Sequence, residues 1–315
     1  MLTEPAALHV RAQDSPPAPR IGCTRAMTWN IEGKRVLITG GTTGIGRATV
    51  TELARRGAEV IFTARSPTAG DEIVAEVAST TGNSAVSHRR LDLDDLGAVR
   101  TFAAQLRADI DRLDVLVNNA GVVLTERRET VDGHEFTFGV NHLGHFALVQ
   151  ELQPLLEASS PARLVVVASD AHKFVKGLDF DDLQSAKGRF GVVKGLAAYS
   201  RSKLANMLFT RELARRVDPA RLTVNCLHPG AVSTRLGRDG EGSRASEIVW
   251  PLAGRFLLTP EQGARTSVWA VTSPELSGVT GEYFAKEKIA KPRKTALDDQ
   301  AAARLWTASE ALVAG

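Results

Sequence analysis

The regular alternation of short apolar runs with longer amphipathic segments is the feature that most constrains how this chain folds. "RVLITG" at 35–40 and "LDVLVNNAG" at 113–121 are short apolar runs, typical of strands that are buried on both faces of a parallel sheet. The segment 45–57 has apolar residues at helical spacing and ends at Gly57, which suits a helix C-cap. Strands separated by helices form βαβ units, so the sequence predicts an α/β fold with a doubly wound parallel sheet, flanked by helices on both faces.

The same pattern continues to about residue 230 and indicates one domain. Further strands are predicted at 59–65, 85–92, 163–169 and 222–230, and further helices at 70–79, 95–108, 133–157 and 197–216. Two long segments, 170–196 and 233–258, break the alternation; long irregular connections on such a scaffold are usually functional or mobile.

The first residues of the chain do not follow this pattern. Residues 1–27 carry four prolines and no periodicity, so we expect a disordered extension ahead of a single domain over 28–315. Neither a basic start nor an apolar core of a secretory signal is present there. No apolar run approaches the ~18 residues of a membrane span. We therefore expect a cytoplasmic protein.

Composition argues against two classes of partner. The net charge of +3 comes from 39 basic and 36 acidic residues, and no basic run with interleaved aromatic residues appears, so nucleic-acid binding is not expected. Cys23 and Cys226 lie far apart without a CxxC partner, and the histidines lack an HExxH-type spacing. We expect no structural disulfide, no metal site, and a reducing compartment.

A glycine-rich loop, "TGGTTGIG" at 39–46, joins the first predicted strand to the first predicted helix. In that context Gly40 permits a tight turn, Gly44 lets the backbone approach a pyrophosphate, and Gly46 lets helix and strand pack closely. The helix N-terminus then faces the phosphates with unpaired N–H groups. An ordinary glycine-rich turn is the alternative. The context favours a dinucleotide site on a Rossmann-type sheet.

The end of the second predicted strand distinguishes NADP from NAD. An acid there would bind the ribose 2′-hydroxyl, but "FTARS" places Ala64 and Arg65 at this position. Arg47 directly follows the last glycine of the loop. Two guanidinium groups suit a 2′-phosphate, so NADP(H) is predicted over NAD(H). The alternative is two solvated arginines.

The loop spacing resembles the short-chain dehydrogenase/reductase family, whose loop reads TGxxxGIG, and the resemblance spans about residues 33–285. It implies that Asp92 meets the adenine amine and that Thr234 holds the nicotinamide carboxamide. The motifs "TGGTTGIGR", "LDL", "NNAG" and "HPGAVST" imply most of the cofactor site, and Arg65, Tyr199 and Lys203 complete it. The full set of implied cofactor-binding residues is Thr39, Gly40, Thr42, Thr43, Gly44, Ile45, Gly46, Arg47, Arg65, Asp92, Leu93, Asn119, Ala120, Gly121, Tyr199, Lys203, Pro229, Gly230, Val232 and Thr234.

The stretch "AYSRSKLAN" places Tyr199 and Lys203 one turn apart on a predicted helix. The family's catalytic set is Asn, Ser, Tyr and Lys, which matches Asn141, Ser169, Tyr199 and Lys203 here. Hydride transfer to a carbonyl leaves an alkoxide that needs a proton. A tyrosine supplies it if a nearby ammonium and the oxidised nicotinamide lower its pKa, while a serine hydroxyl polarises the carbonyl. By resemblance, Lys203 also binds the ribose hydroxyls and Asn141 holds a water that links Lys203 to solvent.

Each catalytic residue has a simpler interpretation. Tyr199 and Lys203 can be a surface pair, Asn141 a residue that caps or kinks its helix, and Ser169 an ordinary strand-end serine. Ser169 follows Ala168, where the family often has a second serine, and its separation from Tyr199 is longer than in most relatives. His172 either lines the substrate cleft, lies at the surface, or supports the cleft from behind.

Motifs outside the loop, including "SDAH" and "NCLHPG", resemble the retinol dehydrogenase and WW-domain oxidoreductase branch of the family. That branch handles lipophilic aldehydes, retinoids and alcohols, with NADP common. The sequence shows no apolar anchor run, so we do not carry over a retinoid substrate. The apolar residues of 233–258 either cover an apolar substrate or pack in the core.

The predicted function is an NADP(H)-dependent oxidoreductase that interconverts an alcohol and an aldehyde or ketone, with Tyr199 as general acid/base and a small lipophilic substrate. One alternative is a catalytically degenerate NADP-binding or sensing protein, and another is a lyase or epimerase on the same fold. Family members often pair through the helices predicted at 133–157 and 197–216, which would give a homodimer or homotetramer. The same apolar faces also serve to cover the sheet, so the oligomeric state stays open.

Overall fold

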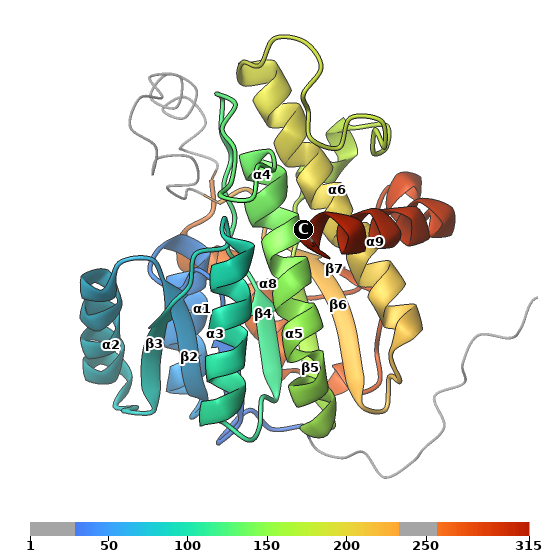
Figure 1. Cartoon of the computed structure of the whole chain (residues 1–315). Coiled ribbons are helices and arrows are strands. Elements are labelled where there is room, and N and C mark those ends of the chain that lie inside the picture. The colour runs from blue at the N-terminus through green and yellow to red at the C-terminus, as the bar shows by residue number, and fades with distance from the viewer. Residues whose placement is uncertain (1–28, 233–256, 315) are drawn as a thin grey trace, which may run out of the picture.

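Seven parallel strands form the centre of the molecule (Figure 1). The computed structural model describes residues 29–232 and 257–314. In that part of the chain the strand order is β3-β2-β1-β4-β5-β6-β7, and every neighbouring pair is parallel. This confirms the predicted doubly wound parallel sheet. The strands are β1 (Arg35–Ile38), β2 (Glu59–Ala64), β3 (Val86–Arg90), β4 (Val115–Asn118), β5 (Ala162–Val167), β6 (Leu222–His228) and β7 (Tyr283–Ala285).

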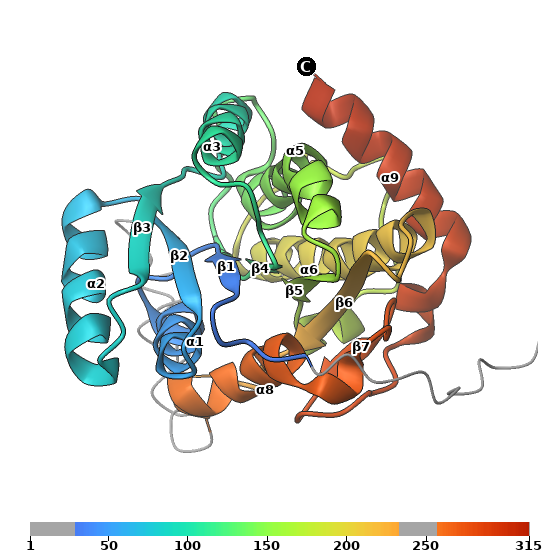
Figure 2. The same ribbon diagram turned by 90° about the horizontal axis from the view of Figure 1, so that it is seen from below.

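Helices cover both faces of this sheet (Figure 2). One apolar layer packs α1, α2 and α8 against the sheet, and the other packs α3, α5, α6 and α9 against the opposite face. The central strands are therefore buried on both sides, which explains their almost wholly apolar sequences. The helices are α1 (Gly44–Arg55), α2 (Pro67–Thr81), α3 (Leu96–Asp109), α4 (Phe136–Phe138), α5 (Gly144–Ala158), α6 (Val192–Arg216), α8 (Pro260–Thr272) and α9 (Asp299–Ala314).

Side-chain caps fix where several helices begin. Ser66 accepts a hydrogen bond from the backbone N–H of Ala69, with proline at the first helical position of α2. Thr259 and Gln262 form a reciprocal capping box at the start of α8. Such caps satisfy backbone N–H groups that lack a partner inside the helix.

Three predicted helices begin elsewhere in the structure, and the one predicted from residue 70 begins at Pro67. The helix predicted from residue 133 begins at Phe136, because the carboxylate of Glu135 accepts from the N–H groups of Thr137 and Phe138 and caps it there. It is continuous through α4 and α5 but widens into a π-turn at Gly139–Leu143. The helix predicted from residue 197 begins five residues earlier, at Val192, and the three apolar residues of this extra turn, at 192, 193 and 196, are exposed.

The C-terminal helix α9 lies across α6 and the π-turn (Figures 1 and 2). Its Trp306 stacks on Phe209 with ring centroids 6.0 Å apart and meets Phe146 edge-on at 5.0 Å. The chain's own α9 therefore covers part of the surface formed by α5 and α6. The predicted pairing of two copies through these helices stays a prediction.

Some predictions fall at or beyond the limits of the described residues. The extension at 1–27 and most of the segment 233–258 lie outside them, and the domain boundary at residue 28 stays a prediction. Within 29–232 and 257–314, no helix combines the length and apolar character needed to cross a bilayer. Across these same residues, no group of three side chains is arranged to hold a metal ion.

Candidate active site

The strand order reverses between β1 and β4, and in open α/β sheets ligands bind at the carboxyl ends of the strands beside such a reversal. The glycine loop follows β1 directly. It is attached to β2, since Gly40 N–H donates to Thr63 Oγ1 at 3.0 Å and Gly41 N–H donates to the Thr63 carbonyl at 3.2 Å. The loop is thus fixed at the reversal point.

The loop geometry fits a pyrophosphate group. Gly40 and Gly44 have φ of +69° and +54°, values that favour glycine. A Cβ on Gly46 would lie 2.0 Å from the Gly40 carbonyl oxygen, so only glycine fits where α1 meets the loop. The N-cap residue of α1, Thr43, makes no side-chain capping bond, and the first turn of α1 contains no acid. The N–H groups at this helix end are therefore available to an anion.

Thr39 has a different role from the predicted cofactor contact. Its side chain is completely buried, and its hydroxyl oxygen accepts from Asn119 N–H at 2.9 Å and Ala120 N–H at 3.0 Å. The Asn119 amide in turn donates to the carbonyls of Thr39 and Gly40. With no exposed surface, Thr39 does not contact a cofactor; it ties the "NNAG" segment to the glycine loop.

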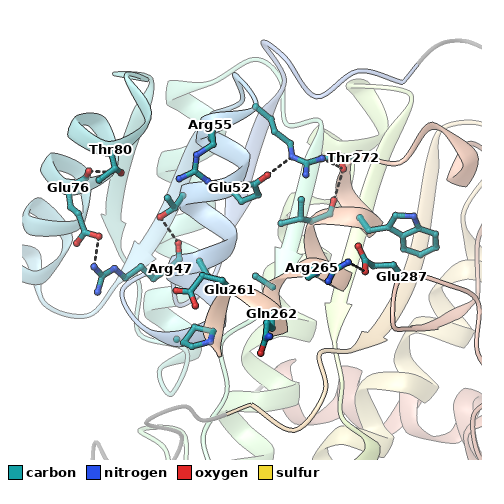
Figure 3. A pocket seen from close by; sticks show the side chains of 18 residues that line it. Arg47, Glu52, Arg55, Glu76, Thr80, Glu261, Gln262, Arg265, Thr272 and Glu287 are labelled. Atoms are coloured by element: carbon teal, nitrogen blue, oxygen red, sulfur yellow. Dashed lines mark hydrogen bonds and ion pairs between the residues drawn. The ribbon is translucent and has the colours of Figure 1, made fainter. Parts of the chain in front are cut away.

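The two arginines predicted to bind a 2′-phosphate are placed differently. Arg65 is exposed and directly follows β2. Arg47 pairs with Glu76 of α2 (Figure 3), in a groove of about 860 Å³ lined by α1, α2 and α8. A phosphate contact by Arg47 requires this exposed ion pair to open, and its role at the 2′-phosphate stays a prediction.

The remaining residues predicted around the adenosine lie at the same edge of the sheet. Asp92 is half-buried and forms an ion pair with Arg90 at 3.1 Å, while the side chain of Leu93 is buried. In the loop, Thr42 and Ile45 are half-buried and Thr43 is exposed.

The structure brings the four predicted catalytic residues together. Ser169, at the end of β5, lies near enough to the phenol of Tyr199 on α6 to influence the pKa of that phenol. Lys203 Nζ lies 5.6 Å from the Tyr199 ring centroid and donates to the Val167 carbonyl at 3.0 Å. A Cβ placed on Gly121 would lie 3.3 Å from Lys203 Nζ and 3.5 Å from Asn141 Oδ1. The side chains of Lys203 and Asn141 therefore both lie beside Gly121, the last residue of "NNAG".

Asn141 lies in the π-turn, a local widening that is frequent at functional sites. Its Oδ1 accepts from Val122 N–H at 2.7 Å, and its Nδ2 donates to the Val122 carbonyl at 2.9 Å and to Ser202 Oγ at 3.0 Å. Ser202 Oγ donates to the Tyr199 carbonyl at 2.7 Å. Sequence reasoning missed Ser202; its place one residue before the lysine was the only available signal.

Burial governs the ionisation of the Tyr199–Lys203 pair. It raises the pKa of Tyr199, and the neighbouring Ser169 side chain only partly opposes this. Burial also lowers the pKa of Lys203 to about 8. For the protein alone, the direction is opposite to the expected lowering of the tyrosine pKa. At neutral pH the phenol keeps its proton and Lys203 is largely charged.

Three polar side chains meet just beyond Ser169. The Asp170 carboxylate accepts from the Tyr283 hydroxyl at 2.8 Å, and His228 Nε2 lies 3.6 Å from its other oxygen. His172 is buried; its Nδ1 bonds the Ser169 carbonyl at 2.7 Å, and its Nε2 accepts from Arg293 N–H. Of the three alternatives for His172, the supporting position is the one observed.

The segment after β6 reaches the same edge. Pro229 and Gly230 are half-buried, and Val232 is buried and bridged to Leu258. A Cβ on Gly230 would lie 2.4 Å from the Leu258 side chain. Thr234 lies outside the described residues.

Comparison with known proteins accords with this geometry. Residues 34–177 match the short chain dehydrogenase family, and residues 183–287 match the enoyl-(acyl carrier protein) reductase family. The chain is 43% identical to human retinol dehydrogenase 14 over 300 residues, covering 90% of this chain and 87% of the relative. It is 42% identical to human retinol dehydrogenase 13, covering 90% and 85%.

Solved structures show the same fold. A protein of Mycobacterium paratuberculosis superposes with a TM-score of 0.70 at 33% identity, covering 93% of this chain and 97% of that one. A short chain dehydrogenase of Escherichia coli CFT073 in complex with NADPH superposes with a TM-score of 0.63 at 25% identity, covering 81% and 97%. With the glycine loop and the Asn-Ser-Tyr-Lys set in place, this chain belongs to the short-chain dehydrogenase/reductase family of oxidoreductases.

Proposed function

We propose that this protein is an NADP(H)-dependent oxidoreductase that interconverts an alcohol and an aldehyde or ketone. The observation that carries the proposal is the meeting of Ser169, Tyr199, Lys203 and Asn141 at one edge of the sheet, beside the uncapped end of α1. A glycine loop alone would fit any dinucleotide-binding protein. A phenol, a hydroxyl and an ammonium converging beside it are what carbonyl reduction needs.

Each of the four residues has a separate role in the proposed reaction. When bound, the nicotinamide supplies or accepts the hydride. Ser169 donates a hydrogen bond to the carbonyl oxygen, which polarises it and fixes its position. Tyr199 gives its proton to that oxygen as negative charge develops; a raised tyrosine pKa suits this role, because it keeps the phenol protonated. The Lys203 ammonium near the ring then stabilises the phenolate. Asn141 holds the Val122 backbone beside Lys203.

Preference for NADP(H) rests on Arg65. It stands at the end of β2, where an acid would otherwise bind the ribose 2′-hydroxyl. The NADPH complex of the Escherichia coli relative supports the same choice. We propose Arg65 for the 2′-phosphate because it directly follows β2; Arg47, which pairs with Glu76, would join it only by leaving that partner. The loop residues Gly40, Thr42, Thr43, Gly44, Ile45 and Gly46, together with Asp92, Leu93, Asn119, Ala120, Gly121, Pro229, Gly230, Val232 and Thr234, complete the proposed site.

The proposed substrate is a small lipophilic carbonyl or alcohol, in keeping with the retinol dehydrogenases to which the chain is similar.

The cytoplasmic location stays a prediction, which cell fractionation of the tagged full-length chain tests. The oligomeric state is tested by sedimentation of the purified protein.

The decisive experiment has two parts. NADPH and NADH affinities are measured by fluorescence titration of the purified chain, and oxidation of NADPH is then followed across a panel of aliphatic, aromatic and polyene aldehydes and ketones. We expect tighter binding of NADPH and turnover of at least one apolar aldehyde, with cofactor oxidised in equal amount to alcohol formed. Tight NADPH binding without turnover on any carbonyl would support a sensing protein instead. Product formed without net cofactor oxidation would indicate a lyase or epimerase.

A further inference from the structure

His145 is a buried histidine that the proposed chemistry does not use. It lies on α5, one turn after Asn141, with only 3% of its surface exposed. One ring nitrogen, Nε2, lies 2.8 Å from Thr39 Oγ1, and the other, Nδ1, lies 3.2 Å from the Asn141 carbonyl oxygen. The ring thus bridges the first residue of the glycine loop and the π-turn that carries Asn141.

The bonds of Thr39 determine which nitrogen carries the proton. A hydroxyl oxygen offers two lone pairs and one proton. Both lone pairs of Thr39 Oγ1 are used by the N–H groups of Asn119 and Ala120. Its proton therefore goes to an acceptor, and His145 Nε2 at 2.8 Å is closer than the Val117 carbonyl at 3.4 Å. Nε2 is unprotonated, so the ring proton lies on Nδ1 and is donated to the Asn141 carbonyl.

We propose that His145 is a positioning residue, which in its Nδ1–H form holds the glycine loop and the Asn141 turn in a fixed relation through one directed chain of hydrogen bonds. The chain runs from Asn119 and Ala120 N–H to Thr39, from Thr39 O–H to His145, and from His145 to the Asn141 carbonyl. The expected effect of this chain on cofactor binding rests on the proposed function, whereas the assignment of the ring proton to Nδ1 does not.

Protonation of the ring would break this chain. A doubly protonated imidazole would point an N–H at Thr39 Oγ1, which has no lone pair left to accept it. Burial and the charge of Lys203 lower the pKa of His145 to about 4. The ring therefore stays neutral at physiological pH, and both of its bonds persist.

A second buried histidine in the same helix provides a matched comparison. His142 Nε2 also lies 2.8 Å from a buried hydroxyl, that of Ser309 on α9. This bond resembles that of His145 in length and burial but does not lead to the glycine loop. If buried histidines here served only to fill space, removing either bond would have the same consequences.

The affinity test uses His145→Phe, which keeps a ring of similar shape without its bonds, His145→Gln, whose amide offers one acceptor and one donor, and Ser309→Ala as the control. We expect His145→Phe to weaken NADPH binding about tenfold, His145→Gln to recover at least part of this, and Ser309→Ala to change it less than about twofold. Thr39→Val should also weaken NADPH binding. The double variant Thr39→Val/His145→Phe should bind NADPH no more weakly than whichever single variant has the lower affinity. Equal affinities for His145→Phe and Ser309→Ala, or independent losses in the double variant, would overturn the proposal.

The tautomer test needs neither cofactor nor turnover. In the full chain labelled with ¹⁵N-histidine, the His145 signals, assigned by their loss in His145→Gln, should show Nδ1 protonated and Nε2 unprotonated at neutral pH. An Nε2–H form would overturn the proposal even if every variant weakened binding. Should the wild-type chain bind neither NADPH nor NADH, the proposed function fails while the tautomer result still decides this inference. Should His145→Phe not fold, His145→Gln and the wild-type spectrum decide it.

Discussion

The Ser169 side chain lies beside the phenol of Tyr199, near enough to influence its pKa, although a long irregular segment separates the two residues in the sequence. Ser169 stands at the carboxyl end of β5 and Tyr199 two turns into α6. The insertion that lengthens this connection is accommodated by a short 3-10 helix, Asp170–Phe174, and an earlier start of α6. Ser169 and Tyr199 therefore lie next to each other despite their unusually long separation in the sequence.

Tyr199→Phe should abolish turnover, because phenylalanine has no proton to give the developing alkoxide. NADPH affinity should stay within about fivefold of wild type, since one hydrogen-bonding hydroxyl contributes only about 1 kcal/mol. Steady-state rates and fluorescence titration check both parts. Tyr283→Phe is the control, since it removes the other tyrosine hydroxyl of the chain, the one bonded to Asp170. Undiminished turnover of Tyr199→Phe would rule out Tyr199 as the acid.

Arg65→Ala should weaken NADPH binding by about 10- to 100-fold and leave NADH binding nearly unchanged. Charge-assisted hydrogen bonds to a phosphate contribute about 1.5–3 kcal/mol, and NADH lacks that phosphate. Arg47→Ala is the comparison, because it removes the second predicted guanidinium, which lies on α1 and pairs with Glu76. Paired titrations with both cofactors make the comparison. A larger effect for Arg47→Ala than for Arg65→Ala would reverse the assignment of the two arginines.

Gly46→Ala should abolish cofactor binding and destabilise the fold by about 1–3 kcal/mol or more. Its methyl group would lie 2.0 Å from the Gly40 carbonyl oxygen, a backbone atom that cannot move without displacing the loop. Gly191→Ala is the control, since a Cβ there meets nothing within 4 Å and the backbone is extended. Thermal unfolding and NADPH titration distinguish the two. Wild-type binding by Gly46→Ala would contradict the described packing of α1 on the loop.

Acid should destabilise the protein through its buried histidines. Burial lowers the pKa of His142 to about 3 and that of His145 to about 4, below the ordinary 6.5. Below pH 6.5 these two histidines become protonated in the unfolded chain but stay neutral in the folded chain. Their contribution to stability is therefore complete above about pH 6.5 and is lost as the pH falls toward 4. Each histidine contributes about 2 kcal/mol of this loss by about pH 5.

The variant His142→Phe/Ser309→Ala isolates one of these contributions. Phenylalanine suits a site already bordered by Phe138, Phe146 and Phe209, and the second change avoids leaving the serine unpaired. The fall in melting temperature between about pH 7 and pH 5 should be smaller in this variant than in the wild type. An equally steep fall would show that His142 is not protonated on unfolding in this range.

Much of the fold could be predicted because its signals are local. Continuous apolar strands and the glycines of the loop identified the parallel sheet and the cofactor edge without any knowledge of distant contacts. The Tyr199–Lys203 pair was predictable for the same reason, because helical spacing alone places both on one face. The comparisons confirm the family and the fold.

Features that depend on distant partners were not predictable. Arg47 pairs with Glu76 because α1 and α2 pack side by side, and Thr39 is buried because Asn119 and His145 close over it. The direction of the tyrosine pKa depends on burial, which a sequence does not state. The helix α9 was not predicted, since its role depends on the faces of α5 and α6 that it covers.

The parallel course of all seven strands has a practical consequence. The glycine loop and the residues that follow β5 and β6 all emerge from the carboxyl ends of the strands, at the upper rim in Figure 1. The exposed turn at 218–220, which leads into the opposite end of β6, lies away from that rim. Immobilising the protein on a sensor chip or fusing a reporter through that turn should leave the upper rim open to dissolved cofactor and substrate.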